Sequence, residues 1–484
     1  MSAVAALVVS AALAGCGGTT YFAGRTLPPS GLTNRVAIAI QNPSTLTKGA
    51  LQFVDAYYDT RSGYNGKPGS YSISGFSGAL PITIQNLPEE QLGLVYSSGD
   101  GTFSTINYAT EASTGSAAAG LNGLSSSIFG TRSQAYVFAA SQASHVLTVA
   151  DHTNGGSFPL ALPGVYRVSV NPGGSVALAF AQNSNYIYYP RKLTTAQGIA
   201  YSGGPTTWPK AAVDCEPQTA PVYCLFQAQS PDNVDATGNY YGAPLVFDRP
   251  VKAVFSADGG TAYILNCGPE CGGSKASISV LPVGPMIFLI GQQSGTLPTS
   301  AALANSTVAI PGGASNALVD SSTLYVVGQE PMSDGYFGGH LTVVNLLSNT
   351  ASAPIAISDG APGAISRMLL ADDNTLWIGM TQCTNGERAH NPSVYTSGYG
   401  CLSMLNVATP ASPTVTLIEP YIGDATGIAA VTGLHKVYTA EGGQVYIHST
   451  VDGSSIDNQY VTVTGTAYDV AYMDATSDSD NTVY

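Results

Sequence analysis

The sequence is poor in charge. Lys, Arg, Asp and Glu make up 10% of its 484 residues, against about 25% in a typical soluble domain. The 16 basic and 30 acidic residues give a formal net charge of −14, and no basic run occurs. Nucleic acid requires clustered Lys and Arg to neutralise its phosphates, so the composition argues against a nucleic-acid partner. The acidity itself is consistent with solubility.

The chain also lacks the motifs that mark common catalytic sites. It has no G-x-S-x-G nucleophile elbow, no H-E-x-x-H zinc motif, no G-x-G-x-x-G fingerprint and no P-loop. Its six His residues are scattered singly. Asp474, Asp478, Asp480 and Asn481 partly match a calcium loop, but the Gly and the terminal Glu of an EF-hand are missing. The sequence therefore predicts no cofactor, no metal site and no catalytic residue.

No apolar run is long enough to span a membrane, which takes about 20 residues. The run Ala3–Ala14 instead fits the h-region of a signal peptide, although no Lys or Arg precedes it. It ends in Leu13-Ala14-Gly15-Cys16, which resembles a bacterial lipobox. The resemblance implies that residues 1–15 are a lipoprotein signal peptide and that Cys16 carries the lipid. The alternative is a plain secretory signal with a chance cysteine.

The residues that follow Cys16 indicate where such a lipoprotein would reside. Gly17 and Gly18 replace the Asp that favours inner-membrane retention in lipoproteins, so the resemblance implies the outer membrane or the cell surface. Residues 16–34 are rich in Gly, Thr and Pro and are expected to form a flexible tether. Two acyl chains would hold the protein firmly, where one would not.

In contrast, glycine is abundant, with 55 residues, and so are short β-branched and aromatic runs. The stretch Val251–Val283 shows the pattern most clearly. A strand-like run is followed by the turn Ala257-Asp258-Gly259-Gly260, then by a second run around Tyr263, a Cys-Gly tip and a third run. Asp-Gly tolerates the positive φ of a tight hairpin, and the flanking runs have strand composition.

The same pattern recurs along the chain, with an aromatic residue marking each second strand. These aromatic residues are Tyr96, Tyr136, Phe180, Tyr263, Tyr325, Trp377, Tyr438 and Tyr484. The period of about 40 to 60 residues is that of propeller blades. A four-stranded sheet cannot bury both of its apolar faces alone, but sheets packed face to face in a ring cover one another.

The two ends of the chain are expected to share one blade. Ala467–Met473 looks like a first strand, whereas Arg35–Gln41, Leu51–Thr60 and Tyr71–Gly75 look like later strands with no first strand before them. Sharing would fasten the ring and remove free sheet edges. The sequence thus predicts an all-β fold, a β-propeller of seven or eight four-stranded blades. The count favours eight, in a single domain over residues 35–484.

Each repeat consists of a strand, a turn with Asp or Gly, and a second strand with a Tyr-Val pattern. In this pattern the repeats resemble the YVTN-type, lactonase-like β-propeller repeats. The whole chain also resembles acidobacterial-type surface lipoproteins of this architecture. The resemblance implies the propeller fold but leaves the activity open, because such propellers include binding proteins, scaffolds and a few hydrolases. Two less regular regions remain. Thr194–Arg249 is expected to be an extra blade or an insertion, and Ala112–Ser127 a surface loop.

Seven cysteines are present. Setting Cys16 aside for the lipid leaves an even number in an exported chain, which favours disulfides. Proximity in the sequence suggests the pairs Cys215–Cys224, Cys267–Cys271 and Cys383–Cys401. Zinc is disfavoured at Cys267 and Cys271, because the C-x-x-C spacing and a companion pair of ligands are missing.

The longest insertions after second strands are Cys267–Lys275, Glu330–His340 and Gln382–Gly400. They belong to consecutive repeats and join second to third strands, so they should crowd one rim of one face. Aromatics and a few charges on bridged loops suit recognition of a protein or glycan. The binding candidates in these loops are Glu270, Asp334, Tyr336, Phe337, His340, Glu387, Arg388, His390, Tyr395 and Tyr399.

Two classes of function follow. The first is a non-enzymatic binding or scaffold protein, anchored to the membrane through its lipid, with an envelope protein or glycan as partner. The second is a lactonase-like hydrolase or lyase that acts on a lactone or glycan in the central channel. The inner strands offer Arg167, Lys252, Arg367 and Asp469 there, too few to define a mechanism. Only two Trp residues argue against a dehydrogenase propeller, whose blades need Trp-rich docking motifs.

The lipobox yields a direct prediction. Mass spectrometry of the mature protein should find Cys16 as the first residue, with the mass of a diacylglyceryl group. A mature terminus at another residue, or an unmodified Cys16, would contradict the anchor.

Overall fold

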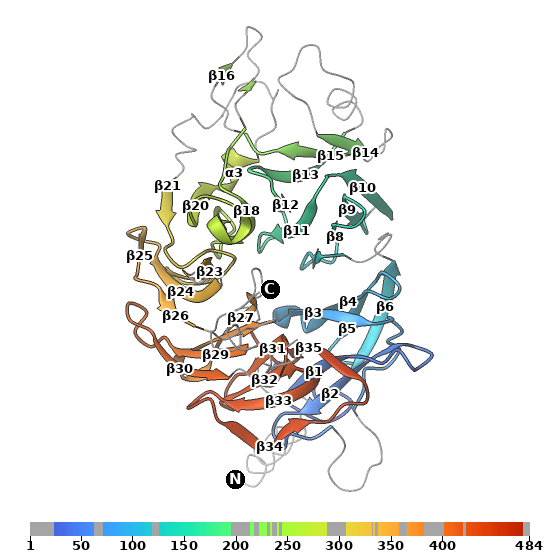
Figure 1. Cartoon of the computed structure of the whole chain (residues 1–484). Coiled ribbons are helices and arrows are strands. Elements are labelled where there is room, and N and C mark those ends of the chain that lie inside the picture. Colours follow the sequence, from blue (N-terminus) through green and yellow to red (C-terminus); the bar gives the residue numbers. More distant parts are fainter. Residues whose placement is uncertain are drawn as a thin grey trace, which may run out of the picture.

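The fold is an eight-bladed β-propeller. The computed structural model describes residues 24–61, 71–118, 125–153, 155–194, 213–216, 222–229, 233–234, 240–241, 244–287, 306–331, 333, 337–357, 365–381, 401–419 and 423–477. Eight small antiparallel sheets stand in a ring around a common centre (Figure 1). The all-β class and the count of eight blades are thus confirmed.

The blades follow the chain in order. Blade 1 joins β35 (Thr466–Tyr472), β1 (Arg35–Gln41) and β2 (Gly49–Asp55). Blade 2 holds β3 (Pro81–Leu87), β4 (Leu92–Ser97), β5 (Thr102–Asn107) and β6 (Ala112–Ala118), and blade 3 holds β7 (Ser127–Gly130), β8 (Tyr136–Ser141), β9 (Val146–Asp151) and β10 (Gly156–Ala161). Blade 4 holds β11 (Val165–Val170), β12 (Ala177–Ala181), β13 (Ile187–Leu193), β15 (Val222–Gln227) and β14 (Asp214–Glu216).

The second half of the ring continues in the same way. Blade 5 holds β18 (Pro250–Phe255), β19 (Thr261–Asn266), β20 (Ser277–Pro282) and β21 (Ser306–Ala309), and blade 6 holds β22 (Asn316–Asp320), β23 (Thr323–Pro331), β24 (Phe337–Asn345), β25 (Thr350–Ala351) and β26 (Ile355–Ala356). Blade 7 holds β27 (Ile365–Ala371), β28 (Thr375–Met380), β29 (Cys401–Asn406) and β30 (Thr414–Glu419), and blade 8 holds β31 (Ala425–Val431), β32 (Lys436–Glu441), β33 (Gln444–Ser449) and β34 (Ser455–Val461). Outside the blades lie the strand pair β16 (Asn233–Val234) and β17 (Tyr240–Tyr241), and the short helices η2 (Pro88–Glu90), η3 (Gly268–Cys271), α3 (Val283–Met286) and η5 (Asp372–Asn374).

The local chemistry of the repeat explains its hairpins. In blade 5, Asp258 Oδ1 accepts hydrogen bonds from the Ser256 hydroxyl and, at 3.0 Å, from the Gly260 N–H. Gly259 has a φ of +70°, a conformation that glycine adopts without steric cost. The turn therefore reverses the chain between β18 and β19, as the Asp-Gly signal predicts.

The marker aromatic residues pack between blades. Those that the structure describes all lie in second strands, as expected, and Tyr484 lies outside the described residues. Trp377 in β28 is fully buried and packs with Leu369, Ile428 and Val437, so that it joins blade 7 to blade 8. Burial of large aromatic side chains between neighbouring sheets supplies much of the stabilisation.

The predicted closure is confirmed. β35 pairs antiparallel with β1, and β1 pairs with β2, so that strands from both ends of the chain form one sheet. The expected strand Tyr71–Gly75 is not formed as such. Ser72 and Ser74 make only isolated bridges, to Gln52 and to Ala112 of blade 2. This segment therefore links two blades instead of completing a regular ladder.

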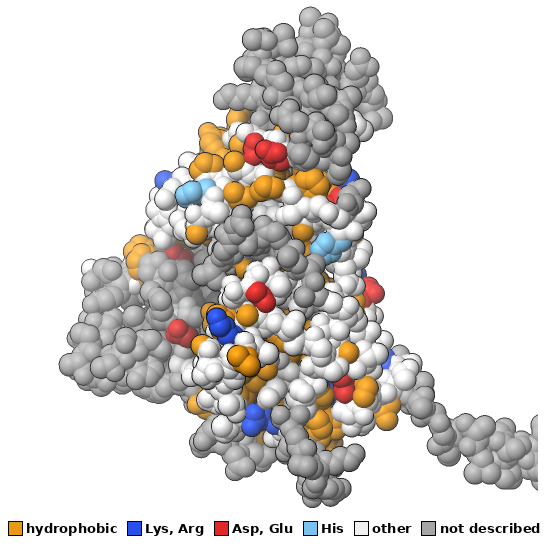
Figure 2. All heavy atoms as spheres, turned by 90° about the vertical axis from the view of Figure 1, so that its right-hand side faces the viewer, with side chains coloured by type: hydrophobic (Ala, Val, Ile, Leu, Met, Phe, Trp, Pro, Cys, Tyr) orange, Lys and Arg blue, Asp and Glu red, His pale blue; other side chains and the backbone are white. Residues whose placement is uncertain are grey.

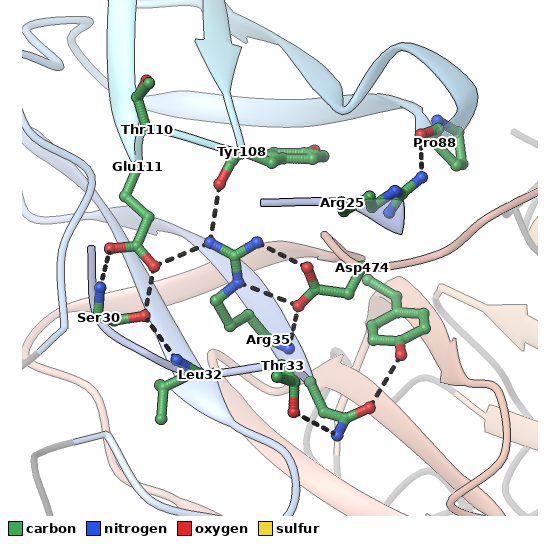
Figure 3. Close-up of polar contacts among 12 residues, drawn as sticks. Arg25, Ser30, Leu32, Thr33, Arg35, Pro88, Tyr108, Thr110, Glu111 and Asp474 are labelled. Atoms are coloured by element: carbon green, nitrogen blue, oxygen red, sulfur yellow. Dashed lines mark hydrogen bonds and ion pairs between the residues drawn. The ribbon is translucent and has the colours of Figure 1, made fainter. Parts of the chain in front are cut away.

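A buried cation fastens the closure (Figure 3). Arg35 at the start of β1 is 1% exposed, and its Nη2 and Nε donate to the two oxygens of Asp474, which follows β35, at 2.6 and 3.0 Å. Its Nη1 donates to Glu111 Oε1 and to the Tyr108 carbonyl of blade 2, both at 2.8 Å. Burial alone would lower the pKa of Arg35, but the hydrogen bonds and charges of Asp474 and Glu111 outweigh it and raise the pKa.

The segment before β1 also packs on the ring. The Ser30 hydroxyl and N–H donate to Glu111, and Arg25, which is buried, donates to the Pro88 carbonyl at 2.7 Å. A tether was expected over residues 16–34. Of that range the structure describes residues 24–34, and there the chain is held against blade 2.

One other expectation needs correction, and one alternative that the sequence left open is settled. Ala112–Ser127 was expected to be a surface loop, but β6 forms within it and pairs with β5. An outermost strand is held by backbone hydrogen bonds, so small residues are sufficient. Thr194–Arg249 does not form a further blade among its described residues, because β15 pairs with β13 and extends blade 4 outwards. The region is thus an insertion within blade 4.

The described surface carries few charged side chains, in agreement with the low content of charged residues. On the face in Figure 2, charged side chains stand singly among uncharged ones. Among the described residues, no helix has the length and apolar content to cross a membrane.

Arg35 provides a test of the closure. Arg35→Met should lower the free energy of unfolding by about 3–5 kcal/mol, because it leaves two buried carboxylates without this cation. The matched control is Arg132→Met, which removes an ion pair to Glu89, a side chain that is 51% exposed, and should cost less than about 1 kcal/mol. Urea denaturation measures both changes. Equal losses at the two positions would contradict a special role for Arg35.

Candidate functional site

The first strand of each sheet lies at the centre of the ring. Contacts run from β7 to β11, β18, β22, β27, β31, β35 and β3 in turn. The ring closes between β3 and β7, where the Gln85 side chain exchanges two hydrogen bonds with the backbone of Gly130. The centre is therefore built from eight inner strands, one from each blade.

A bulge near the start of the inner strand recurs around this centre. In six blades the pairing register shifts by one residue there, and the two remaining inner strands begin their pairing at Asn316 and Ser127. We call one residue of each inner strand its hub position. In the six strands with a bulge it is the first paired residue after the shift, and in the two other strands it is the first paired residue. The hub positions of blades 1 to 8 are Asp469, Thr83, Ser127, Arg167, Lys252, Asn316, Arg367 and Gly427.

Several hub residues join neighbouring blades. Asp469 Oδ2 accepts the Ile84 N–H at 2.8 Å, and Ser127 Oγ accepts the Val168 N–H at 3.2 Å. At Gly427 there is no room for a side chain, since a Cβ would lie 2.5 Å from Asp469 Oδ1. Some hub residues therefore hold the inner strands together.

The charged hub residues are distributed unevenly around the ring. The four inner-strand charges noted in the sequence all occupy hub positions, and three of them, Arg167, Lys252 and Arg367, are cations on blades 4, 5 and 7. Lys252 is 7% exposed, and its Nζ donates to Asn316 Oδ1 at 2.7 Å. Arg167 Nη1 donates to the Ser315 carbonyl at 3.3 Å.

These cations influence one another. Burial, together with the positive charges of Arg167 and Arg367, lowers the pKa of Lys252 well below its ordinary value of 10.5. The eight hub positions hold one carboxylate and no His, so they do not supply the carboxylate and His cluster that a hydrolase or lyase at this centre would use.

The cationic hub residues lie on the same face as the long loops. Lys252 pairs with Leu265 and Arg367 with Gly379, just before β19 and β28 end at Asn266 and Met380. The loops that join second to third strands begin there. We call this the loop face. The predicted insertion of blade 5 and the described part of that of blade 6 lie there, on the same side of the ring as the cations, whereas Gln382–Gly400 of blade 7 lies outside the described residues.

Glu270 proves to be a structural residue. It lies in η3, is 8% exposed, and its Oε2 accepts the Gln329 N–H of β23 at 3.0 Å. The adjoining Cys267 and Cys271 pack in one cluster with Tyr166 of blade 4. The loop of blade 5 is thus fixed to both neighbouring blades, and Glu270 is not an exposed contact for a partner.

The hairpin of blade 6 carries two other candidates. β23 and β24 pair as far as Pro331 and Phe337, where Phe337 is half-buried at the tip. His340 lies opposite Gly328, with its Nδ1 buried. The remaining candidates, Asp334, Tyr336, Glu387, Arg388, His390, Tyr395 and Tyr399, lie outside the described residues.

Two of the predicted disulfides are confirmed. Cys215–Cys224 joins paired residues of β14 and β15, and Cys267–Cys271 closes the loop around η3. Cys401 is also disulfide-bonded, and its predicted partner Cys383, like Cys16, lies outside the described residues. Disulfides indicate an oxidising compartment.

Other features were not anticipated from the sequence. Asp474, noted as part of a calcium-like pattern, is an ion-pair partner of Arg35. Asn316 and Ser315 hold hub cations, and only an alignment of the repeats on their bulges would have singled them out. A cavity of about 240 Å³ also opens between blades 2 and 3, lined by residues that include Phe103, Gln134 and His152.

No protein-family model matches the sequence, and no curated protein matches it. Solved structures that resemble it include a putative 6-phosphogluconolactonase from Bacteroides fragilis, with 10% identity, 91% of this chain and 97% of that chain covered, and a TM-score of 0.44. Kuenenia stuttgartiensis hydrazine synthase has 12% identity and a TM-score of 0.44 over 81% of this chain and 100% of that chain. These similarities concern the propeller fold alone.

Lys252 yields a prediction on pH. The pKa of the Lys252 amine in the folded protein lies below its ordinary value of 10.5, which applies to the unfolded chain. At a pH between these two pKa values, the amine is protonated in the unfolded chain and neutral in the folded protein. The free energy of unfolding of the wild type should therefore rise with pH in this window. In Lys252→Met this contribution should disappear, while Lys275→Met, at an exposed lysine of the same face, should follow the wild type. Denaturation at a series of pH values measures the difference, and parallel profiles for the wild type and Lys252→Met would contradict it.

Proposed function

We propose that this protein is an exported, lipid-anchored β-propeller that acts as a non-enzymatic binding or scaffold protein at the cell envelope. The lipobox at Cys16 and the disulfides support export. Its partner would be an envelope protein or a glycan, recognised by the loop face of blades 5 to 7.

The observation that carries this proposal is the rigid mounting of the loops. The η3 loop is closed by Cys267–Cys271 and fixed to blade 6 through Glu270 and Gln329. The hairpin of blade 6 extends on the same side. Loops held in one conformation on a rigid scaffold lose little entropy on binding, which favours recognition.

The path of the N-terminal segment supports an anchored arrangement. Residues 24–34 run along the face opposite the loops, because Arg25 contacts Pro88 in the turn between first and second strands, and Glu111 lies between third and fourth strands. A lipid at Cys16 would therefore draw this opposite face towards the membrane. The loop face would then point outwards, where a partner has access.

The proposal is tested by capture on intact cells. After cross-linking of the anchored, tagged protein, Phe337→Ala should reduce recovery of the partner by about tenfold or more, as expected for an aromatic contact residue. Leu347→Ala is the control, because Leu347 is 84% exposed in the turn at the opposite end of the same strand. Unchanged recovery with Phe337→Ala, or loss only with Leu347→Ala, would contradict a role for the loop face.

A further inference from the structure

The cavity of about 240 Å³ between blades 2 and 3 is a gap in an otherwise close-packed ring. Its lining comes from β4, β5 and β6 of blade 2 and from β7, β8 and two turns of blade 3. Between blades 3 and 4, in contrast, the rings of Phe158 and Tyr223 pack with their centroids 4.4 Å apart. The fold therefore does not require a gap between neighbouring blades, and an unfilled gap costs stability.

The floor of the cavity is apolar. Leu94, Phe103 and Val137 line it, and each of these side chains is at most 5% exposed. They are held by close packing, since a Cβ at Gly130 would lie 2.6 Å from Leu94 Cδ1 and 2.8 Å from a carbon of the Phe103 ring. One aromatic ring and two aliphatic side chains provide a surface for the apolar face of a ligand.

The mouth of the cavity is polar and uncharged. Thr114 is the extra residue of a β-bulge, because the register of β5 with β6 passes from Gly115 directly to Ser113. Thr114, Gly115 and His152 are exposed and border the mouth. Bulges are frequent next to binding and active sites. Among the described residues that line the cavity none is Lys, Arg, Asp or Glu, which favours a neutral ligand.

Two side chains at the mouth are held with hydrogen-bonding groups to spare. Gln134 Oε1 accepts from Thr105 Oγ1 of blade 2 at 2.9 Å, which leaves the amide hydrogens as donors. His152 Nδ1 lies 2.9 Å from the Gln134 carbonyl oxygen. This oxygen can only accept, so we assign the proton to Nδ1, and Nε2 of the neutral imidazole is then an acceptor. The mouth thus offers a donor and an acceptor in fixed positions.

We propose that this cavity binds the terminal hexose ring of a neutral glycan. A pyranose has an apolar face of C–H groups, which fits the floor, and an edge of hydroxyls, each of which can donate and accept. Gln134 and His152 bond these hydroxyls. The volume lies below the roughly 300–1,000 Å³ of pockets for larger ligands and suits one ring. The exposed mouth lets the rest of the glycan continue outwards.

The inference goes beyond the proposed partner recognition, because the cavity is not on the loop face. Gln134 lies in the turn between β7 and β8, and His152 follows β9. Turns between first and second strands and between third and fourth strands lie on the face opposite the loops. The protein therefore has a second binding site that does not use the loops of blades 5 to 7.

Saturation-transfer NMR on the full chain tests the site. The probes are the methyl glycosides of glucose, galactose, mannose and N-acetylglucosamine, with cyclohexanol as an apolar ring of similar size. At least one glycoside should receive saturation from the protein, and it should bind more tightly than cyclohexanol. Gln134→Leu should weaken its binding about tenfold, because a hydrogen bond to the ligand is lost.

Gln142→Leu is the matched control. Gln142 lies between β8 and β9 on the loop face, and its Nε2 donates to Gln182 Oε1 of blade 4 at 2.8 Å. This change also removes a glutamine hydrogen bond between neighbouring blades, but it leaves the cavity intact, so the glycoside should bind as to the wild type. His152→Ala, at an exposed position, should also weaken binding and serves if Gln134→Leu does not fold.

Three results would overturn the proposal. The first is the absence of saturation transfer to every glycoside, and the second is equal binding by the wild type, Gln134→Leu and His152→Ala. The third is tighter binding of cyclohexanol than of every glycoside, which would make the cavity a site for apolar molecules. A disaccharide that ends in the bound hexose should bind at least as tightly as the methyl glycoside, and its exclusion would contradict a glycan as ligand.

This proposal and the proposed function fail separately. If the glycoside binds through Gln134 but no partner is captured on cells, the sugar site stands and the function of the loop face does not. If partner capture depends on Phe337 but no glycoside binds, the loop face is a binding surface and the cavity is not a sugar site.

Discussion

Every blade of this protein has two apolar faces, and this constraint governs the rest of the structure. No blade is stable without a neighbour on each side, so the sheets form a closed ring. Closure brings together Arg35 and Asp474, which are 439 residues apart in the chain. A bidentate, buried ion pair at this seam is strong only while both partners are present. The ring is therefore fastened at one seam, and blade 2 reinforces it through Glu111.

The same ring leaves some positions free to vary. Each inner strand has one hub position at the centre, where burial of an apolar side chain is not needed. Ser127 and Asp469 use that position to bond the next inner strand, whereas Lys252 bonds the side chain of Asn316 and stays close to two other cations. Because the same position recurs in every blade, some hub residues hold the ring together, and others can acquire a binding role.

The sequence predicted what depends on local pattern. The aromatic residues in the second strands of blades 2 to 8 and the Asp-Gly turns identified the blades, because large side chains and positive φ values leave clear signals. The strand β6 was missed, since small residues such as Ala112 and Gly115 carry no strand signal, although the backbone of β5 holds them. The burial of Glu270 and its acceptor role towards Gln329 were not predicted, because they depend on a neighbouring blade. Such contacts between distant segments have no counterpart in local composition.

The two faces of the propeller carry different structural features. The seam, with Arg35 and the segment from Gly24 to Asn34, lies on one face, and the long loops with the cationic hub lie on the other. Because the stabilising charges are buried at the seam, the loop face does not have to contribute to closure. On the loop face, Lys252 is buried and bonds the Asn316 side chain of the next blade. A propeller closed by an ion pair on one face can in this way carry charged inner-strand residues towards the other face.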